Sequence, residues 1–162
     1  DLNKYRRAVK GVNMAALLYF EDEAGEQIEP SREQPPYDLD ADVIQIDDVD
    51  FGIWYLDMND NPQRYAGKTV RFLGKVMIPR GFKTDMFIPG RNAMTCCAQD
   101  IRFIGYICKS RHTCQLKQRQ WVEVTAEVKY ENMREYGGEG PVLYAKHLKT
   151  VGAPAEELVY FN

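Results

Sequence analysis

Residues 122–130, which read VEVTAEVKY, decide the fold class of this 162-residue chain. The even-numbered positions are apolar or aromatic, and every position between them is polar or charged. An alternation with a period of two places one set of side chains in a core and the other in solvent, as in a half-buried β-strand. The sequence therefore predicts that the domain is built around β-structure.

A second strand is predicted at residues 70–78, which read VRFLGKVMI. Gly74 in its middle indicates a bulge or a sharp bend of the kind that closes a small barrel. Turn residues at 79–81, 89–90 and 136–141 separate the remaining candidates. Further strands are expected at residues 43–46, 85–88, 93–98, 103–108 and 142–151. Several short strands with such breaks are typical of a small β-barrel or sandwich.

One short helix is expected at residues 51–58. Phe51, Trp54, Tyr55 and Met58 recur at helical spacing, and such a stripe indicates core packing rather than a ligand site. Asp48 or Asp50 is the expected N-cap, because a carboxylate there accepts hydrogen bonds from first-turn amides. Residues 59–62 are expected to end the helix.

Charge divides the chain into an acidic arm and a mildly basic body. Residues 21–50 carry twelve acidic residues and one basic residue, whereas residues 51–162 carry sixteen basic and eleven acidic residues. Two interpretations of the arm stay open: a solvated linker, or a cover for a basic surface of this chain or of a partner. The apolar stretch at residues 14–20 before it fits either a short helix or a strand. We expect an N-terminal segment and arm at residues 1–42, a barrel domain at 43–155 and a tail at 156–162.

The cysteines are confined to a short region. Residues 92–100 read NAMTCCAQD, and all four cysteines lie within 19 residues of the chain. Neighbouring residues of a strand point to opposite faces, so one of Cys96 and Cys97 is expected to pack inward and the other to face a ligand. A disulfide between sequence neighbours is strained, so the pair is not expected to form one.

A metal site is the first functional hypothesis for this region. Thiolate and imidazole donors suit zinc and copper(I). Asp100 is expected to act as a further ligand or to orient one. The lower-ranked candidates come from residues 108–114, which read CKSRHTC: they are Cys108, His112 and Cys114. The competing interpretation is that Cys96 or Cys97 is a small buried apolar residue, as free cysteines commonly are.

A thiol-redox role is another hypothesis for the same cysteines. Lys109, Arg111 and His112 would favour the thiolate form of a nearby cysteine. In an oxidising compartment, Cys108 and Cys114 could instead close a structural disulfide, which would remove two of the candidate metal ligands. The redox state of these two cysteines would therefore distinguish the metal hypothesis from the disulfide hypothesis.

The run from residue 44 to residue 154 resembles the C-terminal soluble domain of the YcgQ-like bacterial proteins. The pieces that carry the resemblance are Asp50–Phe51, Asn61–Pro62, Tyr65–Val70, Gly74–Val76, Met94–Asp100, Gly105, Gln120–Thr125, Pro154 and Val159–Tyr160. The resemblance implies an OB-like barrel, closed or partly open, next to the membrane and outside the cytoplasm. It also implies membrane helices before the domain and a multi-spanning permease as partner. Cys108, His112 and Cys114 lie outside the pattern.

The sequence itself contains no apolar run of about 18 residues that could span a membrane. Because the chain begins at Asp1, we expect a piece of a longer protein whose anchor lies outside it. We therefore expect a non-enzymatic accessory domain of a permease system. It would bind a metal ion, zinc or copper, or a small ligand near Cys96, Cys97 and Asp100.

The alternative from another class is a barrel that binds single-stranded nucleic acid. OB-type barrels use basic and aromatic residues for this purpose. The candidates are Tyr106, Lys109, Arg111, Lys117 and Arg119. The acidic net charge of -3 and the lack of an aromatic–basic pattern argue against it.

The sequence contains none of the common hydrolase motifs. There is no Gly-x-Ser-x-Gly, no glycine-rich phosphate loop and no His-Glu-x-x-His. His147 lies in a predicted strand and is expected to be structural or exposed. A Cys/His nucleophile pair would require His112 to lie close to Cys96 or Cys97 in space.

Overall fold

The computed structural model describes residues 33–161. The helix or strand expected at residues 14–20, and the first part of the acidic arm, lie outside the described residues. The described end of the arm packs on the domain: the Tyr37 hydroxyl lies 2.6 Å from that of Tyr65, and the Lys68 ammonium donates to the Leu39 carbonyl at 2.8 Å.

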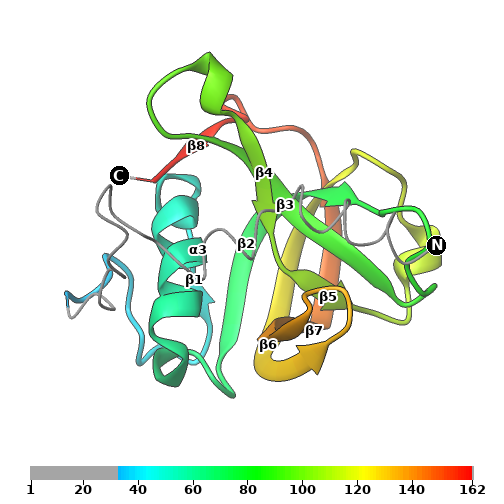
Figure 1. Ribbon diagram of the computed structural model, residues 1–162, viewed down its shortest axis with the longest axis horizontal. Coiled ribbons are helices and arrows are strands. Elements are labelled where there is room, and N and C mark those ends of the chain that lie inside the picture. Colours follow the sequence, from blue (N-terminus) through cyan, green and yellow to red (C-terminus); the bar gives the residue numbers. More distant parts are fainter. Residues whose placement is uncertain (1–32, 162) are drawn as a thin grey trace.

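Five strands form a closed barrel (Figure 1). They pair in the order β2-β6-β7-β5-β3, and β3 pairs back with β2 to close the ring. Only β5 and β7 run parallel within this ring. This connectivity is that of the five-stranded OB barrel, which confirms the predicted fold class. The bounds are β2 Thr69–Met77, β3 Met86–Met94, β5 Ile107–Lys109, β6 Trp121–Met133 and β7 Gly138–Val151.

Three short strands extend the barrel at its edges. β1 (Ile44–Gln45) runs parallel to β2, and β4 (Arg102–Gly105) pairs with the second half of β3. β8 (Val159–Tyr160) runs parallel to the end of β3. Residues 156–162, expected as a tail, therefore contribute a strand to the sheet.

The turn predicted at residues 89–90 is wrong, because β3 runs through both residues. Pro89 faces Val76 in the middle of the three β2–β3 pairs, and on its other side it lies between the part of β3 that pairs with β5 and the part that pairs with β4. Gly90 allows close packing rather than a turn: a Cβ there would lie 2.3 Å from the Ile104 carbonyl oxygen. Gly90 therefore permits the backbones of β3 and β4 to approach closely.

The bulge considered for Gly74 is absent, because β2 keeps an unbroken register with β6 through this residue. β2 pairs with β6 from Thr69 to Lys75 and with β3 from Lys75 to Met77. A Cβ on Gly74 would lie 2.8 Å from the Pro89 carbonyl carbon, so the glycine permits the contact that closes the barrel. The register shift lies in the β6–β7 pair, between Thr125 and Ala126.

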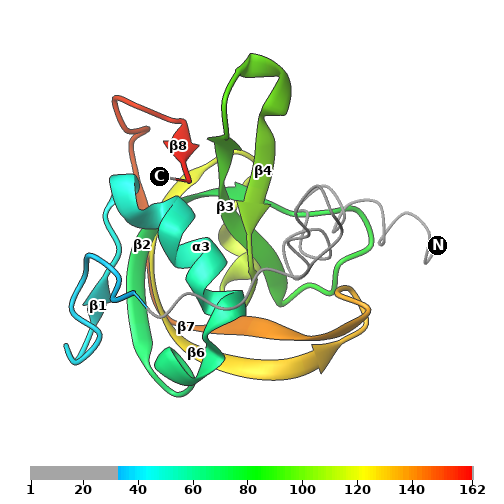
Figure 2. The ribbon, with the colours of Figure 1, turned by 60° about the vertical axis from the view of Figure 1, so that its left-hand side comes forward.

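The predicted helix is α3 (Phe51–Asp60), which lies across one end of the barrel (Figure 2). Its buried face confirms the predicted packing stripe. The Trp54 ring lies 4.7 Å from the ring of Phe72 on β2 and 5.8 Å from the ring of Tyr106. Asp50 occupies the N-cap position, as predicted, but its side chain makes no capping hydrogen bond, and the Asp48 carboxylate accepts a hydrogen bond from Arg91.

Gly52→Ala is expected to destabilise the domain by about 2 kcal/mol, although alanine is the better helix former. A Cβ at this position would lie 2.1 Å from the Tyr160 carbonyl oxygen, so β8 would have to move away from α3. Urea unfolding measures the change. Gly138→Ala is the matched control, since its Cβ would meet no atom within 4 Å. An unchanged or higher free energy of unfolding for Gly52→Ala would contradict the expected clash.

Candidate functional site

Cys96 and Cys97 lie in the connection between β3 and β4, which projects from the barrel at the top of Figure 1. The strand predicted at residues 93–98 is wrong beyond Met94. The last β3–β4 pair is Ala93 with Arg102, so the residues that follow Met94 lack a partner in β4. Both cysteines are therefore exposed, and neither packs into the core.

A turn of 3₁₀ helix, η3 (Ala98–Asp100), brings Asp100 back to the two cysteines. The Asp100 amide donates to the Cys97 carbonyl at 2.9 Å. The Cys96 thiol donates to Asp100 Oδ2 at 2.6 Å, and the Cys97 thiol lies 3.5 Å from the same oxygen. The two Sγ atoms are 3.8 Å apart. The connection thus gathers two thiols and a carboxylate around one small volume.

Hydrogen bonding sets the protonation states of this cluster. The bond to Asp100, and then that to Cys97, raises the pKa of the Cys96 thiol to about 11. In return, the thiols of Cys96 and Cys97 hold the pKa of Asp100 below its usual value. At neutral pH, Cys96 is therefore a protonated thiol beside an ionised carboxylate. A protonated thiol is a poor nucleophile, which counts against the thiol-redox hypothesis for Cys96.

The spacing of the cluster can be compared with that of a tetrahedral zinc ion. With zinc–sulfur bonds of about 2.3 Å and zinc–oxygen bonds of about 2.0 Å, two sulfurs lie about 3.8 Å apart and a sulfur and an oxygen about 3.5 Å apart. The two Sγ atoms, and the pair Cys97 Sγ and Asp100 Oδ2, lie at 3.8 and 3.5 Å. Only the Cys96–Asp100 contact is too short, and it would lengthen by about 1 Å once a metal replaced the shared proton.

The lower-ranked metal candidates lie elsewhere. Among the described residues, the potential ligand atoms within 4.8 Å of one another are those of Cys96, Cys97 and Asp100. Cys108 is buried in β5, and burial raises the pKa of its thiol. His112 and Cys114 are exposed in the connection from β5 to β6. All four cysteines are free thiols in the structure.

The nucleic-acid candidates do not form a stacking surface. Tyr106 is fully buried, its hydroxyl donates to the Tyr55 carbonyl, and Asn59 donates to that hydroxyl at 2.9 Å. Its ring is therefore unavailable to a base. The Lys109 ammonium lies 5.5 Å from the centre of the Tyr144 ring. Arg111, Lys117 and Arg119 are exposed in the β5–β6 connection.

A polar hollow of about 550 Å³ lies between the β2–β3 and β6–β7 connections. OB barrels commonly bind oligonucleotides near these two loops. Its described charged lining consists of three basic residues and three acidic residues, Lys83, Lys109, Arg134, Asp85, Glu131 and Glu135. This balance gives a polyanion little electrostatic attraction. His147, on β7, is exposed.

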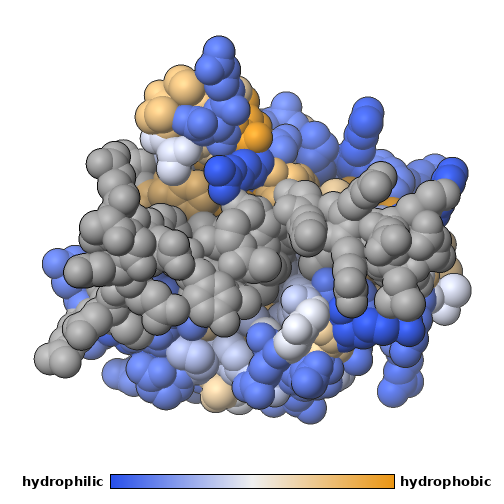
Figure 3. Space-filling view, in the orientation of Figure 1, coloured by the Kyte–Doolittle hydropathy of each residue, from blue (hydrophilic) through white to orange (hydrophobic). Residues whose placement is uncertain are grey.

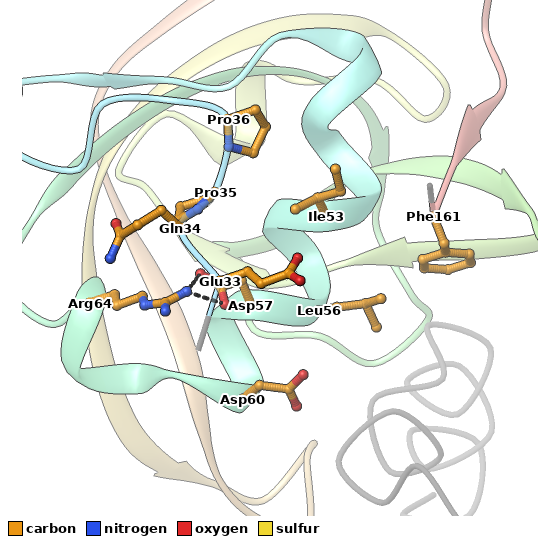
Figure 4. Close-up of a pocket in the computed structure, with 10 residues that line it drawn as sticks. All are labelled: Glu33, Gln34, Pro35, Pro36, Ile53, Leu56, Asp57, Asp60, Arg64 and Phe161. Carbon is orange, nitrogen blue, oxygen red and sulfur yellow. Dashed lines mark hydrogen bonds and ion pairs between the residues drawn. The ribbon is translucent and has the colours of Figure 1, made fainter. Parts of the chain in front are cut away.

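A second hollow, of about 460 Å³, lies between α3 and the described start of the chain (Figure 4). Its polar centre is Asp57, which accepts hydrogen bonds from Asn61 at 2.6 Å, Arg64 at 2.9 Å and Tyr65 at 2.5 Å. These bonds hold the segment after α3 against the helix, so we assign Asp57 a structural role. The sequence analysis does not predict this cluster.

The surface of the projecting β3–β4 connection is partly hydrophobic and partly hydrophilic. Figure 3 shows hydrophobic and hydrophilic colour side by side where Figure 1 places it. Cys96, Cys97 and Ala98 are exposed there, and Ile101 is 42% exposed. The candidate ligands therefore lie at an accessible, partly apolar tip.

No match was found among curated proteins. Solved structures that match include an aspartyl tRNA synthetase from Entamoeba histolytica. The identity is 15%, the match covers 53% of this chain and 19% of that chain, and the TM-score is 0.33. This chain thus spans about a fifth of that enzyme. No helix among the described residues is long and apolar enough to cross a membrane. Residues 20–161 match the DUF1980 C-terminal domain, and the chain therefore belongs to this family.

Proposed function

We propose that this DUF1980 domain is a non-enzymatic binding domain that takes up one soft metal ion at the tip of its β3–β4 connection. Cys96 and Cys97 would supply thiolates and Asp100 a carboxylate oxygen. The observation that carries the proposal is that two of the three donor–donor distances, 3.8 Å between the sulfurs and 3.5 Å between Cys97 Sγ and Asp100 Oδ2, match those around a tetrahedral zinc ion. Thiolate-rich sites favour zinc or copper(I) over magnesium or calcium.

The exposure of the tip suits a site that exchanges its ion. Structural zinc sites commonly close with four protein ligands, whereas three protein ligands leave one position open. The barrel core is packed from side chains that do not include the tip, so folding does not require the ion. The open position would admit water, a small ligand or a donor atom of a partner.

The setting of this site is part of the same proposal. The resemblance to YcgQ-like proteins supports an accessory domain held at the membrane, outside the cytoplasm, beside a multi-spanning permease. The permease would pass the ion to the tip or receive it from there.

Zinc titration of the purified chain, with metal content read by plasma mass spectrometry, tests the proposal. One equivalent is expected per chain. The Cys96→Ser/Cys97→Ser variant should lose stoichiometric binding while its circular dichroism spectrum stays unchanged, because both side chains are exposed. Cys114→Ser is the matched control, an exposed cysteine outside the cluster, and should bind normally. Retention of zinc by the double variant, or its loss in Cys114→Ser, would overturn the assignment.

A further inference from the structure

A hollow of about 670 Å³ lies on the outer face of β2, β3 and β4, beside the connection from β5 to β6. Lys75 and Met77 line it from β2, Asn92 from β3 and Phe103 from β4. Asn92 pairs directly with Phe103, so their side chains share one face of the sheet. Arg119 closes the hollow from the side. We call this hollow the Arg119 groove.

Arg119 is held in an unusual backbone conformation. Its φ of 67° is the only positive φ of a described residue other than glycine. The conformation is fixed by the Arg119 amide, which donates to the Val76 carbonyl at 2.8 Å. The Gln118 side chain also donates to the Ile78 carbonyl at 2.5 Å and accepts from the Ile78 amide at 2.8 Å. A residue with a side chain at such a φ carries strain, and strain of this kind clusters at functional sites.

The charge of the Arg119 groove is opposite to that of the chain. The described lining includes Lys75 and Arg119 and no carboxylate, although the chain as a whole carries a net charge of -3. The Lys75 ammonium lies 3.8 Å from a Glu157 carboxylate oxygen, and this pairing is weak because the Glu157 side chain is 56% exposed. Among the described residues, no hydrogen bond or ion pair engages the Arg119 guanidinium. The groove therefore offers an uncompensated positive charge to an anion.

The floor of the groove is apolar and partly aromatic. A Cβ on Gly90 would lie 2.6 Å from the Phe103 ring, so the missing side chain lets this ring lie against β3. Met77 adds an apolar surface, and Asn92 adds a polar amide to the lining. A flat ring on such a floor makes favourable contacts with the Phe103 ring.

We propose that the Arg119 groove binds a small organic anion, with its phosphate or carboxylate at Arg119 and Lys75 and its flat apolar part over Phe103. Guanidinium groups bind both acidic groups through charge-assisted hydrogen bonds. This binding is independent of the metal site. It gives the domain a second ligand, at the base of the connection whose tip carries Cys96, Cys97 and Asp100.

Phenyl phosphate and benzoate are the probes, titrated separately into ¹⁵N-labelled protein and followed by amide chemical shifts. Inorganic phosphate and benzyl alcohol test each half of the ligand alone. We expect at least one aromatic anion to bind with a Kd on the order of 1 mM, more tightly than either half. The shifts should centre on residues 75–77, 92, 103 and 118–119. The stronger of the two probes identifies the acidic group.

The Arg119→Gly variant tests whether binding can be lost without a loss of stability. Glycine adopts a positive φ freely, so this variant should keep its melting temperature or raise it while binding falls about tenfold. Arg80→Gly removes an equal charge at an exposed residue outside the groove and should bind normally. The proposal is overturned if neither aromatic anion shifts these amides, if inorganic phosphate binds as tightly as phenyl phosphate, or if Arg119→Gly binds as well as the unmodified chain.

Discussion

Replacing Arg91 with methionine is expected to lower the free energy of unfolding by about 3 kcal/mol. The Arg91 side chain is fully buried at the centre of β3. Its guanidinium donates to Asp48 Oδ1 at 2.8 Å and to the carbonyl oxygens of Glu156 at 2.9 Å and Glu157 at 3.1 Å. It also lies 5.0 Å from the centre of the Trp121 ring.

The Arg91 side chain thus connects two segments to the barrel: the one before α3, through Asp48, and the C-terminal one, through Glu156 and Glu157. Each hydrogen bond to a charged group contributes about 1.5–3 kcal/mol to stability. The loss should be smaller than their sum, because the Asp48 side chain is 45% exposed and water can solvate it again. Methionine fills part of the volume, so the remaining cost is that of carbonyl groups left without a donor.

Denaturation in urea, followed by tryptophan fluorescence, gives the free energy of unfolding. Arg111→Met is the matched control, since Arg111 is exposed, and should change stability by less than about 0.5 kcal/mol. Arg91→Lys keeps the charge but cannot reach all three acceptors, so its stability should fall between the other two variants. If Arg91→Met proves as stable as the control, the role assigned to this network is wrong.

Local patterns in the sequence predicted a small β-barrel or sandwich, and the resemblance to YcgQ-like proteins indicated the barrel. The alternation in residues 122–130 corresponds to β6, and the stripe from Phe51 to Met58 corresponds to α3. The errors lie where tertiary contacts override local preference. Pro89 and Gly90 are typical turn residues, yet both lie in β3, where the close approach of the β4 backbone requires glycine at position 90. From the sequence alone, Arg91 would be expected on the surface. It can be buried because the fold places hydrogen-bond acceptors around its guanidinium.

The candidate site was likewise predicted only in part, and local and tertiary contacts explain the difference. Cys96, Cys97 and Asp100 come together through one local turn, so their sequence spacing alone predicted the group. Cys108, His112 and Cys114 depend on how β5 and the β5–β6 connection pack, which spacing does not encode. The left-handed conformation of Arg119 also has no sequence signal, because arginine is not a residue that favours it.

The zinc affinity of the proposed site is expected to rise at least about tenfold per pH unit between pH 6 and pH 8. Metal binds the thiolate, so zinc must displace the proton that Cys96 shares with Asp100. Because the hydrogen bond to Asp100 raises the pKa of Cys96 to about 11, this thiol remains protonated throughout the range. Each unit of pH lowers proton competition tenfold, and affinity therefore increases as pH rises. Competition with a chelator of known zinc affinity measures the slope.

An experiment without metal tests whether the proton shared by Cys96 and Asp100 causes this pH dependence of zinc affinity. In a Cys97→Ser/Cys114→Ser background, the alkylation of Cys96 by iodoacetamide should have a midpoint above the ordinary cysteine value, because only the thiolate reacts and the hydrogen bond to Asp100, the largest cause of the raised pKa, remains. Asp100→Asn removes the charged acceptor, so the midpoint should fall toward the ordinary cysteine value of about 8.5. A zinc affinity that does not change with pH, or an alkylation midpoint that Asp100→Asn leaves in place, would show that the shared proton does not control the site.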